Sequence, residues 1–293
     1  MVEFVDGAPD DLSLVDDPYG TLPWSGPEAA GVGHALITMV EPHRDRLREY
    51  NRWYEDNHYF DGAMQLPWMF SGRRFVAPLD LQALRYPAGS PVARPITAGK
   101  YVSVYWITPG RRHDHMAWTF ATNARHRVTG NISLARDHVF TSFQDHAGSV
   151  YRDADVPDVR WSLVDPPAGL VLQVVDADVP EDRDALERWL VTEHLARRLG
   201  PGSPATCVLV FRTNPPDPGH SEAVYRSQLA VTNGGRRLTV LWMLDRDPRE
   251  VWAEHFVDEV ERVLASGLGR TALVAPFLPC RMGTNAYEDA LFG

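Results

Sequence analysis

Hydrophobic and polar residues follow two periods along this chain, and the periods predict strands and helices in succession. Residues 34–41, HALITMVE, form an apolar run of the kind found in buried strands. In 45–59, apolar and aromatic residues recur at spacings of three and four, which places them on one face of a helix. The first half of the chain also predicts strands at 68–77, 100–108 and 137–144 and a helix at 113–127.

The second half repeats this succession at a constant offset of 136 residues. It predicts strands at 170–177, 205–213, 237–245 and 271–279 and helices at 182–199 and 248–265. Residues that match at this offset are Gly33 and Gly169, Arg52 and Arg188, Trp53 and Trp189, His58 and His194, and Trp106 and Trp242. We therefore expect two copies of one unit, 33–155 and 169–293, in which these pairs superpose. Residues 1–32 are then an N-terminal arm, and 156–168 are a linker.

Each copy has the order strand, helix, strand, strand, helix, strand. This split βαβ order predicts an α+β fold, in which a four-stranded antiparallel sheet carries both helices on one face. The other face of each sheet stays apolar and needs a partner. The sequence therefore predicts two tandem ferredoxin-like repeats whose sheets pack into an intramolecular α+β barrel.

Charge and composition narrow the class of protein. The net charge is −10, and residues 1–30 contain seven acidic residues and no Lys or Arg. We expect this acidic stretch to be extended, and the overall charge argues against a nucleic-acid partner. No apolar run of about 18 residues and no signal-peptide pattern is present, so we expect a cytoplasmic protein with no membrane partner. Two cysteines are too few for a disulfide framework.

A motif resemblance adds to this pattern. The residues that carry it are Trp53, Tyr54 and His58, then Arg73, Arg74 and Phe75, then Tyr101, Tyr105 and Ile107. This arrangement resembles the dimeric α+β barrel superfamily, which includes EthD-type proteins, antibiotic-biosynthesis monooxygenases and polyketide cyclases. The resemblance covers both copies and implies the barrel fold, but its members differ in activity, and a shared fold does not assign a function.

His58 is the first candidate for catalysis. An imidazole titrates near neutral pH, and Asp61 three residues later could orient it as a general base. Cyclases of the resembling fold pair a histidine with a tyrosine, and Tyr54, Tyr101 or Tyr105 could be that tyrosine. The alternative is a structural histidine that caps the C-terminus of its helix.

Arg74 is the candidate for stabilising an oxyanion, because a cation facing the helices would hold an enolate or a phenolate. A surface arginine lying over a helix is the alternative. The second copy has His194, Arg197, Val210, Val251 and Val274 where the first has His58, Asp61, Arg74, His115 and His138. Because apolar residues neither transfer protons nor hold anions, we expect the second copy to be inert.

Further candidates could line a pocket for a flat apolar ligand. Trp68 and Trp118 occur in the first copy alone, while His115 and His138 could bind the substrate or transfer a proton. His113 and His115 could also supply two metal ligands, but no complete ligand set has a recognisable spacing. Motifs for nucleotides, flavins and serine hydrolases are absent, so we expect no metal and no cofactor.

These observations favour a cofactor-free acid/base enzyme, a cyclase, isomerase or lyase, acting on a small apolar aromatic or polyketide-like molecule. Two alternatives stay open at this point: a cofactor-free monooxygenase of a phenol, and a non-catalytic protein that binds a small molecule. The internal duplication predicts a monomer that is itself a pseudo-dimer, or a homodimer.

Overall fold

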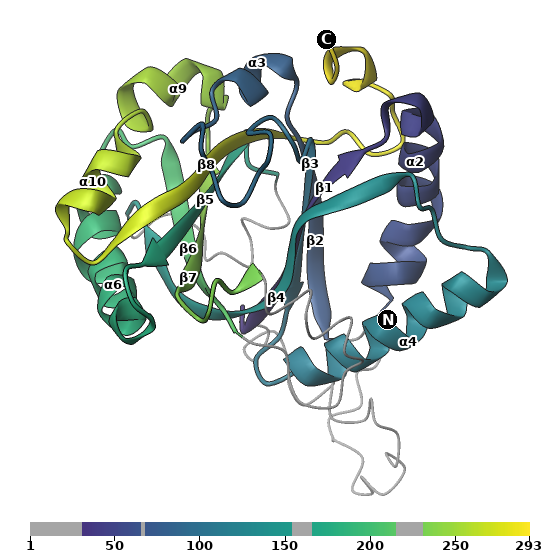
Figure 1. The fold of residues 1–293 in the computed structure, drawn as a ribbon, viewed down its shortest axis with the longest axis horizontal. Coiled ribbons are helices and arrows are strands. Elements are labelled where there is room, and N and C mark those ends of the chain that lie inside the picture. The colour runs from purple at the N-terminus through teal and green to yellow at the C-terminus, as the bar shows by residue number, and fades with distance from the viewer. Residues whose placement is uncertain (1–30, 66–67, 154–165, 215–230) are drawn as a thin grey trace, which may run out of the picture.

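The computed structural model describes residues 31–65, 68–153, 166–214 and 231–293 (Figure 1). The predicted arm, apart from its last two residues, and most of the predicted linker lie outside the described residues. Within the described residues, no helix combines the length and the hydrophobicity needed to cross a membrane.

Eight antiparallel strands close into one barrel in the order β1-β3-β2-β8-β5-β7-β6-β4. They are β1 (His34–Pro42), β2 (Met69–Val76), β3 (Tyr101–Ile107), β4 (Arg136–Tyr151), β5 (Gly169–Ala177), β6 (Ala205–Thr213), β7 (Arg237–Leu244) and β8 (Gly269–Pro279). The mixed α/β class and the barrel agree with the sequence prediction. Each half contributes four strands in the same order, β4-β1-β3-β2 in the first and β8-β5-β7-β6 in the second.

The two four-stranded sheets are joined edge to edge by hydrogen bonds. β4 is much longer than predicted, and its last part, Gln144–Tyr151, pairs with β6. The second seam is short, because β2 pairs with β8 only at Phe75 and Val76. Beyond this point Tyr86 continues along the same edge of β8 through two backbone hydrogen bonds with Val274. The loop that follows β2 therefore completes one side of the barrel.

Helices cover the outside of the barrel on two sides (Figure 1). Those of the first half are α2 (Leu47–Trp53), the π-helical turns η4 (Tyr54–His58) and η5 (Phe60–Met64), α3 (Leu79–Ala83) and α4 (Arg112–Thr129). Those of the second half are α6 (Arg183–Trp189), the π-helical turn η7 (Leu190–His194), α7 (Leu195–Arg198), α9 (Pro248–His255) and α10 (Glu259–Ala265). The described residues also form three short 3-10 turns: η3 (Arg44–Arg46), η6 (Pro180–Asp182) and η8 (Glu288–Ala290).

Local sequence explains several of these boundaries. Asp247 caps α9 by accepting a hydrogen bond of 2.9 Å from the backbone N–H of Arg249, and Pro248 takes the first helical position. Gly130 ends α4 with φ 73°, the left-handed conformation that glycine adopts at little cost. The predicted helix 248–265 is interrupted before Glu259, where Phe256 packs edge-on against Trp242 with ring centroids 5.5 Å apart.

Trp106 and Trp242, which match in the sequence repeat, face opposite sides of the barrel wall. Trp106 points into the barrel, where its ring lies 5.8 Å from that of Phe211 on β6. Trp242 points outward to the helices, and its indole N–H donates to Gln173 Oε1 at 2.9 Å. The expectation that the two tryptophans superpose is therefore wrong, although both occupy the third strand of their halves. The matching tryptophans of the helices, in contrast, have equivalent surroundings. Trp53 and Trp189 each stack on the histidine five residues later.

Two hydrophobic cores result from this arrangement. One combines the barrel interior with the helix-covered side of the first half, and the other lies beneath the helices of the second half. Buried polar side chains also face the barrel interior, among them Ser142, Gln144 and Thr239. The side-chain oxygens of Ser142 and Thr239 and both amide atoms of Gln144 have no hydrogen-bond partner in the part of the chain that the structure describes.

Candidate functional site

A chain of hydroxyl groups lies between the helices and the sheet of the first half. Tyr54, at the start of η4, donates a hydrogen bond of 2.6 Å to Ser103 Oγ on β3. Its hydroxyl also forms a very short contact with the hydroxyl of Tyr105, two residues further along the same face of β3. Burial raises the pKa values of Tyr54 and Tyr105, so both phenols stay protonated at neutral pH.

Arg74 lies against this chain and is completely enclosed. Its position on β2, opposite Ser103, turns the side chain toward the helices. The guanidinium donates to Glu55 Oε1 at 2.9 Å and to Asn51 Oδ1 at 2.8 Å. It also lies 4.3 Å from the ring centroid of Tyr54, a cation–π contact that fixes this ring. Arg74 thus faces the helices as predicted, but a carboxylate already neutralises it.

Tyr101 closes the other side of the Arg74 guanidinium. The centroid of its ring is 3.8 Å from the guanidinium carbon, and its hydroxyl accepts a hydrogen bond of 3.0 Å from Asn51 Nδ2. The C-terminal segment then covers this cluster. Gly283 donates its backbone N–H to Glu55 Oε2 at 2.7 Å, and Glu288 accepts from Asn51 at 2.9 Å. The space left beside these residues is only about 10 Å³, too small for a substrate.

His58 ends η4 and is only partly enclosed. Its ring stacks on Trp53 with centroids 4.3 Å apart and an interplanar angle of 19°, and it lies 5.6 Å from the ring of Tyr54. Gly62 makes room for the ring, because a Cβ at this position would lie 2.4 Å from His58 Nδ1. This Nδ1 atom has no hydrogen-bond partner among the described residues.

The imidazole of His58 stays neutral over a wide range of pH. Burial, followed by the positive charges of Arg136, His126, His138 and Arg74, lowers its pKa to about 3. An uncharged imidazole can accept a hydrogen bond or a proton, while the nearby Arg136 guanidinium disfavours a positive charge on the ring. The same surroundings favour an anion beside the ring.

Asp61 does not orient His58. Its Oδ2 atom lies 2.8 Å from His126 Nε2 on α4 and 3.5 Å from the amide nitrogen of Asn131. Asp61 therefore links η5 to the last turn of α4. The predicted contact between His58 and Asp61 is therefore wrong. A spacing of three residues indicates a shared helix face, but His126 on the neighbouring helix α4 is the residue that contacts Asp61.

The other predicted residues lie in two further places. His115 and Trp118 stack on each other in α4 with centroids 6.4 Å apart, and His115 is eleven residues before His126. At 1.5 Å per residue, this separation is about 16 Å. Trp68 lies at the same end of α4, where its ring is 5.5 Å from the guanidinium carbon of Arg111. These three residues are therefore not brought together with His58.

His138 is near His58, at the start of β4. Its Nδ1 atom lies 2.8 Å from the hydroxyl of Thr141, and the side chain is exposed. Its positive charge, when present, is one of those that lower the pKa of His58. The structure thus groups Tyr54, Tyr101, Tyr105, Arg74 and His58, with His138 at the edge.

The second half has apolar residues where the first has this cluster. Leu190 replaces Tyr54 in the π-helical turn, and Val210 replaces Arg74 on the second strand of the half. Opposite Val210 is Val240, in the place that Ser103 takes opposite Arg74. No chain of hydroxyls is possible at this place in the second half.

A different polar network is buried there instead. His194 Nε2 lies 2.9 Å from Glu259 Oε2, and Gln173 donates to the same oxygen at 3.3 Å. The amide oxygen of Gln173 accepts from Trp242, and Arg198 Nε lies 3.2 Å from the other oxygen of Glu259. The second half therefore holds a buried carboxylate–imidazole pair of the kind that was predicted for the first.

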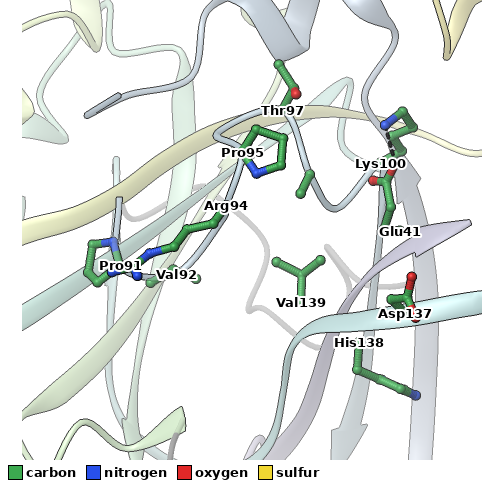
Figure 2. Close-up of a pocket in the computed structure, with 11 residues that line it drawn as sticks. Glu41, Pro91, Val92, Arg94, Pro95, Thr97, Lys100, Asp137, His138 and Val139 are labelled. Carbon is green, nitrogen blue, oxygen red and sulfur yellow. Dashed lines mark hydrogen bonds and ion pairs between the residues drawn. The ribbon is translucent and has the colours of Figure 1, made fainter. Parts of the chain in front are cut away.

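One cavity, with a volume of about 390 Å³, lies at one end of the barrel (Figure 2). Its walls are the end of β1, the start of β4 and the loop before β3. The residues that line it are Glu41, Pro91, Val92, Arg94, Pro95, Thr97, Ala98, Lys100, Asp137, His138 and Val139. Of the predicted residues, only His138 lines it, and Figure 2 shows its side chain directed away from Val139 and the loop.

Sequence reasoning missed several polar residues of these sites. Asn51 and Glu55 are four residues apart on one helix face, a spacing that could have marked them as partners of one cation. No sequence pattern marked Glu259 or Lys100 as a site residue, because the residues that they contact are distant in sequence. Within the described residues, no group of three or more His, Cys, Asp or Glu side chains is arranged to hold a metal ion.

Comparisons with known proteins assign no activity. No protein-family model matches the chain, and no curated protein matches it. Among solved structures, an anthrone oxidase-like protein has a TM-score of 0.48 at 10% identity and covers 86% of this chain and 94% of its own. A chlorite dismutase-like protein has a TM-score of 0.45 at 12% identity, over 88% and 99% of the two chains. A monooxygenase-like protein from Lactobacillus acidophilus has a TM-score of 0.42 at 9% identity, over 84% and 93%. TM-scores and sequence identities this low give no evidence about the activity of this chain.

Proposed function

We propose that this protein is a cofactor-independent proton-transfer enzyme whose substrate is a small apolar molecule with an acidic phenol or enol. The observation that carries the proposal is the environment of His58. This neutral imidazole stacks on Trp53, and the guanidinium carbon of Arg136, the cation that acts most strongly on the pKa of His58, lies 4.6 Å from the centroid of the same Trp53 ring. Such an environment stabilises an anion formed beside the ring.

The proposed step is the transfer of one proton from the substrate to His58. The free imidazole is a weak base, because its pKa is about 3. When the substrate loses its proton, the new negative charge lies next to the imidazolium and raises its pKa. The proton transfer and the stabilisation of the new negative charge therefore support each other. His58 then returns the proton to another atom of the substrate, which completes a cyclisation, isomerisation or elimination.

Tyr54 is proposed to touch the substrate, while Arg74 is a positioning residue. The Tyr54 ring lies next to His58, and its hydroxyl is held by Ser103 and Tyr105. Arg74 fixes the ring of Tyr54 from the other side and is itself enclosed. The proposed active centre thus lies in the first half alone, where Tyr54 and Arg74 have no polar counterpart in the second.

The proposal includes the origin of the two halves. The matching strand orders and the matching Trp–His stacks favour two ferredoxin-like copies in tandem, as in an α+β barrel made from one chain. After duplication, one copy could keep a reactive histidine while the other became a scaffold.

Binding of 4-nitrophenol tests the electrostatic part of the proposal, because its anion absorbs visible light. We expect the wild-type protein to lower the pKa of bound 4-nitrophenol and the Arg136→Gln variant to lower it less. An unchanged pKa of the bound phenol would contradict the proposal.

A hydrogen-exchange experiment tests the proposed proton transfer. In deuterated water, NMR follows the exchange of the acidic C–H protons of 2-tetralone. His58→Ala should slow the protein-dependent exchange roughly 10²-fold, a usual general-base contribution. The matched control is His194→Ala, which should leave the rate near that of the wild type. Equal rates for wild type and His58→Ala would exclude His58 as the base. Oxygen consumption with phenols would instead mark a monooxygenase, and binding without turnover would mark a carrier.

A further inference from the structure

The cavity at the end of the barrel has walls with fixed positions. Arg85 is buried and donates to the carbonyl oxygens of Ala98 and Gly99 at 2.7 and 2.9 Å. Ser90 Oγ donates to Ala272 O on β8 at 2.6 Å and lies 3.1 Å from the backbone N–H of Val92, which donates to it. The loop is thus tied to β8 through Ser90 and braced internally by Arg85, as in ligand sites that exist before the ligand arrives.

The middle of the cavity is apolar. Val92 and Pro95 contribute from the loop, and Val139 points toward them from β4 (Figure 2). Val139 takes this position because β4 is irregular opposite the step from Met39 to Val40, which leaves Val139 unpaired. A volume of about 390 Å³ lies within the range of small-molecule sites.

Each acidic group of the cavity has a neighbouring polar partner. Glu41 forms an ion pair with the buried Lys100 and accepts the backbone N–H of Gly99 at 2.8 Å. Asp137 Oδ2 lies 3.2 Å from His43 Nε2 and is largely exposed to solvent. These groups lie together on one side of the cavity in Figure 2.

Arg94 lies on the other side and is differently placed. Its Nε donates a hydrogen bond of 3.3 Å to the carbonyl oxygen of Ser90, and its side chain extends toward Pro91 (Figure 2). No carboxylate within the described residues forms an ion pair with it. The cavity therefore offers one guanidinium with unused donors, an apolar centre and an ion pair opposite.

We propose that this cavity binds a small aromatic carboxylate, with the carboxylate on the Arg94 guanidinium and the ring between Pro95 and Val139. A guanidinium presents parallel N–H donors that match the two oxygens of a carboxylate. His58 does not line this cavity, and the binding proposed here does not depend on the proposed proton transfer.

Calorimetric titration with 2-naphthoate tests the proposal, with 2-naphthamide as the uncharged analogue of the same shape. We expect saturable binding of the carboxylate and at least tenfold weaker binding of the amide, the usual effect of a charge-assisted contact. Arg94→Gln should weaken 2-naphthoate binding by roughly tenfold or more, and Arg94→Lys by less. The matched control is Arg188→Gln, which removes one exposed arginine from the second half.

A second variant tests the cavity without changing charge. Val139→Trp fills the apolar centre and should abolish binding of 2-naphthoate, with a circular dichroism spectrum and melting temperature confirming that the variant folds. Equal affinity for the carboxylate and the amide, equal effects of the Arg94 and Arg188 variants, or absence of binding at concentrations on the order of millimolar would each overturn the proposal. His58→Ala should leave the affinity unchanged, so failure here is distinguishable from failure of the proposed function.

Discussion

His194 Nε2 lies 2.9 Å from Glu259 Oε2, and both side chains are buried beneath the helices of the second half. Glu259 begins α10, whereas His194 ends η7, so this pair connects the two helical regions of the half. Gln173 on β5 donates to the same carboxylate. The pair thus ties both helical regions to the barrel wall, which gives it a structural role.

Removing Glu259 should therefore reduce stability and not turnover. Glu259→Ala leaves His194 and Arg198 buried without their carboxylate, and breaking a buried pair in this way costs about 3 kcal/mol or more. Urea denaturation measures this loss. The matched control is Glu261→Ala, which removes an exposed carboxylate from the same helix. Equal midpoints for the two variants would contradict the structural role.

His115 should make the protein sensitive to acid. Its imidazole is buried, and burial lowers its pKa to about 4 from about 6.5 in the unfolded chain. Between these values the unfolded chain binds more protons, so the contribution to stability is full above pH 6.5 and falls as the pH drops toward 4. The shift corresponds to about 3 kcal/mol. His115→Leu should lose that much less stability between pH 7 and pH 4 in urea denaturation; parallel pH profiles for both proteins would refute this.

Gln144 should be replaceable with a gain in stability. Its side chain is buried inside the barrel, and neither amide atom has a hydrogen-bond partner in the described residues. Gln144→Met keeps the approximate shape and removes the unpaired polar atoms, which should raise the unfolding free energy by about 1 kcal/mol. The control is Gln173→Met, which breaks hydrogen bonds to Glu259 and Trp242 and should lower it. A loss of stability in Gln144→Met would show that a water molecule or ligand bonds to Gln144.

The sequence predicted the architecture well because hydrophobic periodicity is local. It could not predict which side of the third strand faces inward, because every residue of β3 and of β7 is buried. With both faces buried, no solvent-exposed polar face marks the outer side, and a shift by one residue exchanges the two faces. Trp106 and Trp242 differ for this reason, although their sequence offset equals that of Trp53 and Trp189.

The site was less predictable, since its polar contacts join distant segments. Tyr54, Arg74 and Tyr105 were predicted from their motif and do meet. The partner of Asp61, however, is His126, and the carboxylate near His194 comes from Glu259, 65 residues later. Spacing along one helix reports which side chains share a face, but not which side chain on another element comes closer.

Glu55 and Arg74 should make unequal contributions to stability, although they form one ion pair. Without Arg74, Glu55 still has Arg52 Nη2 at 2.9 Å and the backbone N–H of Gly283 at 2.7 Å. Without Glu55, the guanidinium of Arg74 stays buried with Asn51 as its hydrogen-bond acceptor and aromatic rings around it. An unpaired buried charge is the costlier defect.

Glu55→Ala should therefore destabilise the protein by about 3 kcal/mol or more, and Arg74→Met by clearly less. The double variant should be no less stable than Glu55→Ala alone, because removing the arginine also removes the uncompensated charge. Urea denaturation of the two single variants and the double variant gives the coupling free energy directly. If the two effects simply add, the guanidinium does not depend on Glu55, and the tyrosine rings alone are sufficient to hold Arg74 in place.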